Sequence, residues 1–332
     1  MGRSRERKKH YLQIAAVVFA FIFLLSTALL MISLWENRNS TYFPEGNFGA
    51  QSVIEYNGAE YEFRDGIRTL LVMGLDAYTE ADVIEGYTNP RQADFVMLVV
   101  IDDIAKTVAA LHINRDTMAD VPVLGLAGEK IGIVNKQLAL AYAYGNGKVV
   151  SCRNTADAVS SLLYDVNIDH YVSVTMESVP LFNDLVGGVE VTVLDDFTGV
   201  DDELIKGETV TLMGEKVMTY IRSRKGLDDS SNSARMLRQR QYLNALYEKS
   251  LERSKVDETF ILDAAVLMAD YMVSDCASNQ LTELAQTIVD YEFIGIKYIE
   301  GKNVVGKVHM EFYPEIDSIK KNVTELFCAP KN

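Results

Sequence analysis

Six cationic side chains lie within twenty residues, between Arg222 and Gln241, in a chain of 332 residues whose formal net charge is −15. A planar guanidinium group donates two parallel hydrogen bonds to phosphate oxygens, so clustered arginines are typical of phosphate-binding sites. The alternative is a solvated, salt-bridged helix face. The segment alone therefore indicates either a phosphate site or an exposed helix. The six residues are Arg222, Arg224, Lys225, Arg235, Arg238 and Arg240.

Acidic residues lie at the ends of three consecutive apolar runs of the sequence: Asp76, Asp94 and Asp116. Two arginines, Arg91 and Arg115, lie close to them in the sequence. Each aspartate alone also suits a turn or a helix cap. Together with the arginines of the later segment, however, carboxylates that hold Mg²⁺ are typical of a site that binds a pyrophosphate and transfers one of its phosphoryl groups.

Other common chemistries have little support in the sequence. The chain has no GxSxG or Walker A motif, and its four histidines show no pairing with serine or cysteine that would suggest a catalytic triad. The three cysteines lack the spacing of a zinc site. Cys152 and Cys276 either form a disulfide in an oxidising compartment or remain free thiols.

The elements that must position these residues alternate between strand and helix, which predicts a layered α/β domain. The apolar runs predict buried strands, and the segments between them have the apolar spacing of helices. Predicted strands are 68–75, 94–102, 107–113, 170–175, 189–194 and 304–312, and predicted helices are 134–144, 155–164, 178–185, 234–254, 258–272, 281–289 and 316–327.

The N-terminal region predicts a membrane anchor. Residues 1–10 carry five cations and one acid, and residues 11–35 carry no charge, which predicts a short cytoplasmic tail and a transmembrane helix with the rest of the chain outside the cell. Residues 36–65 are expected to be a juxtamembrane linker or a peripheral hairpin, and 66–332 the extracytoplasmic domain. Without the tail the chain carries a net charge of −19, which disfavours binding of nucleic acid.

The order of several motifs resembles that of the LytR-CpsA-Psr family of cell-wall proteins, over about residues 68–250. The resemblance implies a three-layer α/β/α sandwich with a central mixed sheet and an apolar tunnel for a lipid. It also implies Mg²⁺-assisted transfer of a glycan phosphate from a polyprenyl pyrophosphate to peptidoglycan in a Gram-positive-type wall. The motifs are GLD, RxxD, NRDT, AYAYG, DLVGGVEV, YIRSRK and ARMLRQRQ.

The resemblance also implies a role for individual residues. Asp76 and Asp94 match the metal ligands, and Asp94 is the candidate for a general base. Lys225 and Arg240 are expected on the solvated face. Residues expected to bind the pyrophosphate are Arg91, Arg115, Arg222, Arg224, Arg235, Arg238 and Gln239, of which Arg115, Arg222 and Arg224 join Asp94 as catalytic residues.

The chain departs from the family pattern at a few positions. Ala93 replaces a serine, Asn114 replaces a proline, and Gln137-Leu138-Ala139 replaces Lys-Leu-Asn. Two rival functions remain open. One is a pyrophosphatase that uses water in place of a sugar acceptor, and the other is a lipid-binding wall scaffold or regulator without turnover, which the altered motifs favour.

Overall fold

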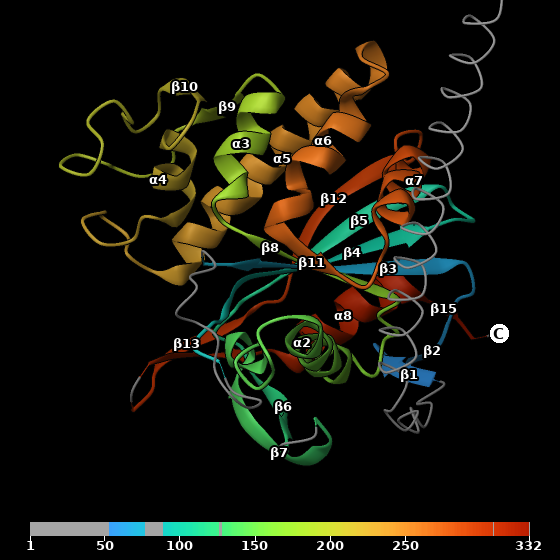
Figure 1. Ribbon diagram of the computed structural model, residues 1–332. Coiled ribbons are helices and arrows are strands. Elements are labelled where there is room, and N and C mark those ends of the chain that lie inside the picture. Colours follow the sequence, from blue (N-terminus) through green and yellow to red (C-terminus); the bar gives the residue numbers. More distant parts are fainter. Residues whose placement is uncertain (1–52, 77–88, 126–127, 308, 332) are drawn as a thin grey trace, which may run out of the picture. The chain divides into compact units, whose positions relative to one another are not determined.

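The computed structural model describes residues 53–76, 89–125, 128–307 and 309–331 (Figure 1). Its centre is a six-stranded mixed sheet in the order β11-β8-β3-β4-β5-β12. Strand β3 pairs antiparallel with β4 and parallel with β8, and β5 pairs antiparallel with β4 and parallel with β12. The bounds are β3 Ile67–Leu75, β4 Ala93–Asp102, β5 Thr107–Ile113, β8 His170–Thr175, β11 Met272–Ser274 and β12 Glu292–Tyr298.

The apolar runs form the middle of this sheet. In β3 every second residue from Thr69 to Leu75 is buried, and β5 is buried from Val108 to Ile113. Aliphatic side chains on both faces of these strands require cover on both faces. The predicted strands at 68–75, 94–102, 107–113 and 170–175 are thereby confirmed to within a residue.

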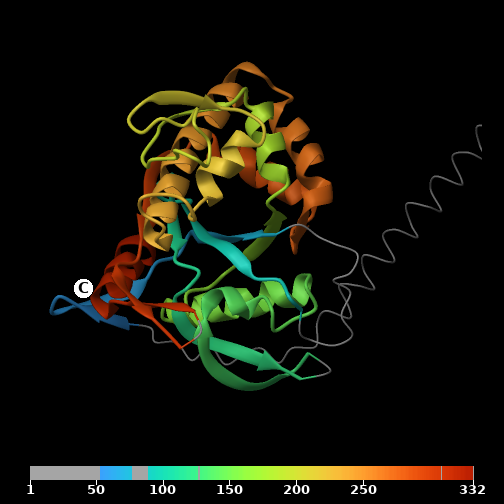
Figure 2. The same ribbon diagram turned by 90° about the vertical axis from the view of Figure 1, so that its left-hand side faces the viewer.

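Helices provide that cover on both faces, as Figures 1 and 2 show. One apolar cluster joins the sheet to α2 and α8, and a second joins α3, α4 and α5 to a small hairpin, β9 and β10. The predicted α/β fold with a central mixed sheet is confirmed. The bounds are α2 Val149–Leu162, α3 Ser178–Leu185, α4 Lys216–Arg222, α5 Asn232–Val256, α6 Phe260–Met268, α7 Ser278–Ile288, α8 Ile316–Phe327, β9 Val189–Thr192 and β10 Thr209–Leu212.

The helix expected at 134–144 is wrong. Residues Lys130–Gln137 form β7, which pairs antiparallel with β6 (Met118–Leu124), and only Leu138–Ala141 turn into a short 3₁₀ helix, η2. The β-branched residues Ile131, Ile133 and Val134 favour the strand. The strand expected at 304–312 is a hairpin, β13 (Gly301–Val305) and β14 (Met310–Pro314), and the helix at 258–272 ends early, at Met268.

Part of the expected linker belongs to the folded domain. Strands β1 (Val53–Tyr56) and β2 (Ala59–Phe63) form a hairpin, and β2 pairs on its other side with β15 (Cys328–Pro330). The hairpin alternative is therefore confirmed for residues 53–63. No helix within the described residues is long and apolar enough to cross a membrane, and the span predicted at 11–35 lies outside those residues.

The three cysteines of the structure are free thiols, which removes the disulfide alternative for Cys152 and Cys276. Cys152 is fully buried on α2 and donates to Ser173 Oγ at 3.3 Å. Burial raises the pKa of its thiol to about 11, so this thiol remains protonated at neutral pH. Cys152 therefore behaves as a core residue.

Candidate phosphate-binding site

The end of β3 and the start of β4, which run antiparallel, place two carboxylates at one edge of the sheet. Leu75 pairs with Ala93 across an irregularity in the register, so that Asp76 and Asp94 lie next to this pair. Each carboxylate contacts an arginine: Asp76 Oδ1 lies 2.6 Å from Arg222 Nη2, and Asp94 forms an ion pair with Arg115. The expected neighbourhood of these acids and arginines is therefore present.

Arg115 is the centre of a polar group at the end of β5. Its Nε lies 3.3 Å from Asp116 Oδ1, and its Nη2 lies 3.3 Å from Gln92 Oε1. The Arg115 side chain is 19% exposed, whereas the Asp116 side chain is 6% exposed. Asp116 is thus more deeply buried than Arg115 and contacts its guanidinium group, while part of the Arg115 side chain remains exposed.

Arg235 on the first turn of α5 joins this group. The residue is 8% exposed, and burial together with the nearby charges of Arg224, Arg115 and Arg222 lowers the pKa of its guanidinium to about 10. Arg235 therefore lies close enough to three other arginines, from two other segments of the chain, for their charges to oppose its own. A cluster of this kind is costly without an anion, because like charges in a partly buried site destabilise each other.

The Arg235 side chain also has an unused donor. Its Nε is buried and has no hydrogen-bond partner among the described residues, whereas its Nη2 donates to Asn232 Oδ1 at 2.5 Å. Buried donors without a partner are rare in folded proteins and need an explanation. A bound oxyanion beside the arginine cluster would supply the missing acceptor.

A chain of amide side chains links the arginines. Asn232 Nδ2 donates to Asn114 Oδ1 at 2.7 Å, and the backbone nitrogen of Asp116 donates to the same oxygen at 2.9 Å. Gln137 Nε2 donates to Asp116 Oδ1 at 3.1 Å. Asn114 and Gln137 are two of the positions at which the sequence departs from the family pattern, and the structure uses both to hold Arg115 and Arg235 in place.

Replacing Asn232 with alanine should therefore weaken the binding of inorganic pyrophosphate about tenfold, because it removes the acceptor that orients a charged donor, an interaction on the order of 1.5–3 kcal/mol. Calorimetric titration of the full chain measures the affinity. Ser233→Ala is the matched control, since Ser233 is exposed and hydrogen-bonds only to Asn303 among the contacts described. Equal affinities in the two variants would contradict the positioning role.

Arg238 differs from its neighbours on α5. It is fully buried, forms an ion pair with Asp195, donates through Nε to Tyr220 O at 2.8 Å and also donates to Ser223 O. Its donors are committed inside the protein, so we place it among the structural residues in place of the expected pyrophosphate role. Because Tyr220 comes just before Arg222 and Ser223 lies between Arg222 and Arg224, Arg238 anchors the backbone that carries these two arginines.

The remaining predicted residues are placed as follows. Arg91 lies beside Gly147, where its Nη1 is 3.8 Å from the position of a Cβ atom on that glycine. Lys225 is exposed, as expected, but Arg240 is half-buried and lies over the ring of Tyr298 at 4.5 Å. The expectation of a solvated Arg240 is therefore wrong, because an aromatic ring of β12 covers its guanidinium.

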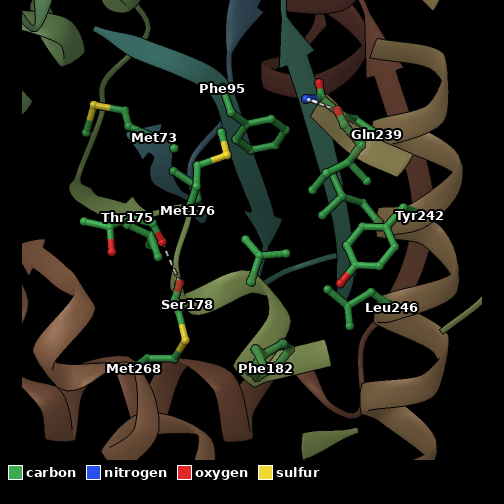
Figure 3. A pocket seen from close by; sticks show the side chains of 16 residues that line it. Met73, Phe95, Thr175, Met176, Ser178, Phe182, Gln239, Tyr242, Leu246 and Met268 are labelled. Atoms are coloured by element: carbon green, nitrogen blue, oxygen red, sulfur yellow. Dashed lines mark hydrogen bonds between the residues drawn. The ribbon is translucent and has the colours of Figure 1, made fainter. Parts of the chain in front are cut away.

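Gln239 marks the point where the polar site meets an apolar pocket of about 250 Å³. Its Nε2 donates to Ile221 O at 3.2 Å. Figure 3 shows Gln239, Tyr242 and Leu246 of α5 on one side of this pocket, opposite Phe95 and residues of the β3 and β8 region. A second apolar pocket of about 320 Å³ shares two lining residues, Phe182 and Met268, with the first.

The residues of the pocket walls carry no distinctive signal in the sequence. Tyr242 and Leu246 follow Gln239 at the spacing of one helix face, which is equally typical of core packing. Asn232 stands at the start of α5, where an asparagine is typical of a helix cap, but the cap is Ser231, whose Oγ accepts from Ala234 N at 3.1 Å. The spacing of apolar residues in α5 therefore predicts that one face of the helix is buried, but it does not indicate that this face lines a pocket.

Comparison with known proteins adds the following. The model of the LytR_cpsA_psr family matches residues 49–327. The chain is 27% identical over 256 residues to the polyisoprenyl-teichoic acid–peptidoglycan teichoic acid transferase TagU of Bacillus licheniformis, which covers 77% of this chain and 76% of that protein. Among solved structures, Bacillus subtilis TagV is 25% identical with a TM-score of 0.57, covering 79% of this chain and 97% of that one.

The structure of TagT bound to LI-WTA is 21% identical to this chain with a TM-score of 0.59, and the alignment covers 79% of this chain and 90% of that one. At this identity the likeness concerns the fold alone. It agrees with the central mixed sheet described above.

Proposed function

This chain belongs to the LytR-CpsA-Psr family, and from this premise we propose that it transfers a glycopolymer phosphate from a polyprenyl pyrophosphate carrier to peptidoglycan. The relatives named as transferases of teichoic acid to peptidoglycan support the reaction class. Cell-wall assembly is the process in which such an enzyme acts.

The observation that carries the proposal is the junction of an arginine cluster with an apolar pocket. Arg235 lies among three other arginines, and Gln239, one helical turn later, lines the pocket of about 250 Å³. A ligand that fits both has an anionic phosphate group attached to a long apolar chain. A polyprenyl pyrophosphate has this chemistry, whereas a soluble nucleotide or sugar phosphate would leave the pocket empty.

The arginines bind and stabilise the pyrophosphate oxygens in this proposal. An acceptor hydroxyl attacks the phosphorus atom that bears the glycan, the bond from that phosphorus to the bridging oxygen breaks, and the polyprenyl monophosphate leaves. Arg115, Arg222, Arg224 and Arg235 hold the negative charge that develops on these oxygens. Asp94 accepts the proton of the hydroxyl, and Arg115 fixes its carboxylate for this task.

The carboxylates of Asp76 and Asp94 are hard oxygen donors at one edge of the sheet, which fits Mg²⁺. They would hold this ion, which would supply further positive charge next to the pyrophosphate. The polar side of the site thus combines arginines that suit the diphosphate oxygens with carboxylates that suit a cation bound to them. The N-terminal segment 11–35 would hold the domain at the outer face of the cell membrane, where the lipid carrier lies.

A transfer assay tests the proposal. The purified full chain is given a polyprenyl pyrophosphate glycan, with and without peptidoglycan, and the lipid and polymer products are separated. The expected products are polyprenyl monophosphate and polymer-linked peptidoglycan, formed only when peptidoglycan is present. Release of lipid phosphate at the same rate without peptidoglycan would favour the pyrophosphatase, and binding without either product would favour the scaffold.

The pocket predicts a dependence on lipid length. Replacing Leu246 with tryptophan should raise the KM for a long polyprenyl substrate at least about tenfold, because the indole ring fills space that would bury several CH₂ groups, each worth about 0.8 kcal/mol. The KM for a short-chain analogue should change little. Leu237→Trp is the matched control, since Leu237 lies on the same helix and is 50% exposed. A similar rise for both lipid lengths would contradict this use of the pocket.

A further inference from the structure

Three potential metal ligands gather on the edge of the sheet, away from the arginine cluster. His170, Asp275 and Cys276 each offer one ligand atom, and these atoms all lie within 4.8 Å of one another. We propose that these three side chains bind Zn²⁺, with water as the fourth ligand. The site does not depend on the proposed transfer reaction.

The pairing of two strands builds this cluster. Strand β8 begins at His170, β11 ends at Ser274, and the antiparallel register pairs Val172 with Ser274. The turn after β11 therefore brings Asp275 and Cys276 next to His170. Ser274 Oγ donates to Tyr171 O at 2.7 Å and accepts from Cys276 N at 3.0 Å, so the backbone of the turn is held in place.

Hydrogen bonds hold part of this cluster in place. The backbone nitrogen of Tyr171 donates to Asp275 Oδ1 at 3.0 Å, which leaves Oδ2 at 3.6 Å from His170 Nδ1. His170 Nδ1 is buried and has no hydrogen-bond partner in the part of the chain that the structure describes. A metal ion would supply its missing partner, and the anchored carboxylate matches the outer-shell hydrogen bonds typical of metal sites.

The mixture of ligands selects the kind of ion. Imidazole nitrogen, thiolate sulfur and carboxylate oxygen are the ligands of Zn²⁺, whereas Mg²⁺ prefers oxygen alone. Zn²⁺ at this site would therefore be chemically distinct from Mg²⁺ at Asp76 and Asp94.

The position of the cluster between the central sheet and α7 means that a bound metal ion would connect the two. In the sheet His170 pairs with Leu70, in the first half of β3, whereas Asp76 follows the end of that strand. Cys276 lies two residues before α7, which lines the second apolar pocket through Leu281, Ala285 and Ile288. A metal ion would tie the start of α7 to the central sheet and so fix one wall of that pocket.

Metal titration of the full chain in detergent, after removal of bound metal with a chelator, tests the site. We expect one Zn²⁺ per chain in calorimetry, and one Co²⁺ with the charge-transfer absorption of a cobalt–thiolate bond. The thermal midpoint should rise on addition of Zn²⁺, because the ion binds the folded state. Cys276→Ser and His170→Gln should each lower Zn²⁺ affinity at least about 100-fold, and Cys276→Ser should abolish the charge-transfer band.

Matched variants distinguish Zn²⁺ binding at this site from binding by other cysteine, histidine or aspartate side chains of the chain. Cys328→Ser, His309→Gln and Asp94→Asn should keep the cobalt–thiolate band and the Zn²⁺ affinity. Asp275→Asn keeps an acceptor for Tyr171 N and should weaken Zn²⁺ binding without loss of folding, which circular dichroism checks. A thiolate band that persists in Cys276→Ser, or Zn²⁺ affinity unchanged in His170→Gln, would overturn the proposal.

Discussion

Arg235→Gln is expected to lower the rate of transfer on the order of 10²–10³-fold while the thermal midpoint stays the same or rises. The rate falls because a preorganised donor to the transition-state charge is lost. The stability does not fall, because burial and the charges of Arg224, Arg115 and Arg222 already lower the pKa of Arg235. A base whose pKa is lowered by folding destabilises the folded state wherever it is charged, so its removal relieves a cost.

Two measurements on the same preparation check this combination. Rates with the lipid-linked substrate give the loss of activity, and calorimetric unfolding gives the thermal midpoint. Lys225→Gln is the matched control, because it removes an exposed cation from the same segment and should leave both values near those of the wild type. A large drop in the midpoint of Arg235→Gln would mean that the arginine holds the fold together, and its assignment to the ligand would then be lost.

Arg238→Met should have the opposite signature, a loss of about 3–5 kcal/mol in the free energy of unfolding. The change leaves the carboxylate of Asp195 buried without its partner, together with the carbonyl oxygens of Tyr220 and Ser223. The segment with Arg222 and Arg224 should also lose its anchor, so that activity falls as a secondary effect. Denaturant unfolding measures the first effect and transfer rates measure the second.

A second substitution distinguishes the loss of the pair from the loss of the residue. In the double variant Arg238→Met and Asp195→Leu no buried charge remains, and replacement of a buried ion pair by apolar groups is often close to neutral. The double variant should therefore regain a large part of the stability. If Arg238→Met alone unfolds at the denaturant concentration of the wild type, the buried pair does not support the fold.

Arg235 and Arg238 illustrate what the sequence could and could not predict. Both lie on the buried face of α5, three residues apart, and both were assigned to the pyrophosphate. The difference arises from Asp195, which lies 43 residues earlier in the chain and reaches Arg238 only through tertiary packing. Local spacing indicates which face of a helix is buried, but it does not indicate which distant carboxylate the face meets.

The strands were predictable for a physical reason. Continuous runs of aliphatic residues suit a strand covered on both faces, and carboxylates at either end of such a run lie at the edge of the sheet. The helix predicted at 134–144 was wrong because the apolar residues of this segment suit a helix and a strand alike. The pairing of β7 with β6 decides in favour of the strand. The role of Asn232 could not be predicted from the sequence, because an asparagine at the start of a helix is a common cap.

The pairing of β2 with β15 has a consequence for how the chain acquires its structure. Phe63 pairs with Cys328, so this small sheet joins the first described strands to the last. A chain that is synthesised from its N-terminus presents β2 with one free edge until nearly all later residues have emerged. The sheet closes as a late step, and a chain interrupted before residue 328 would retain an exposed strand edge, which favours aggregation and degradation.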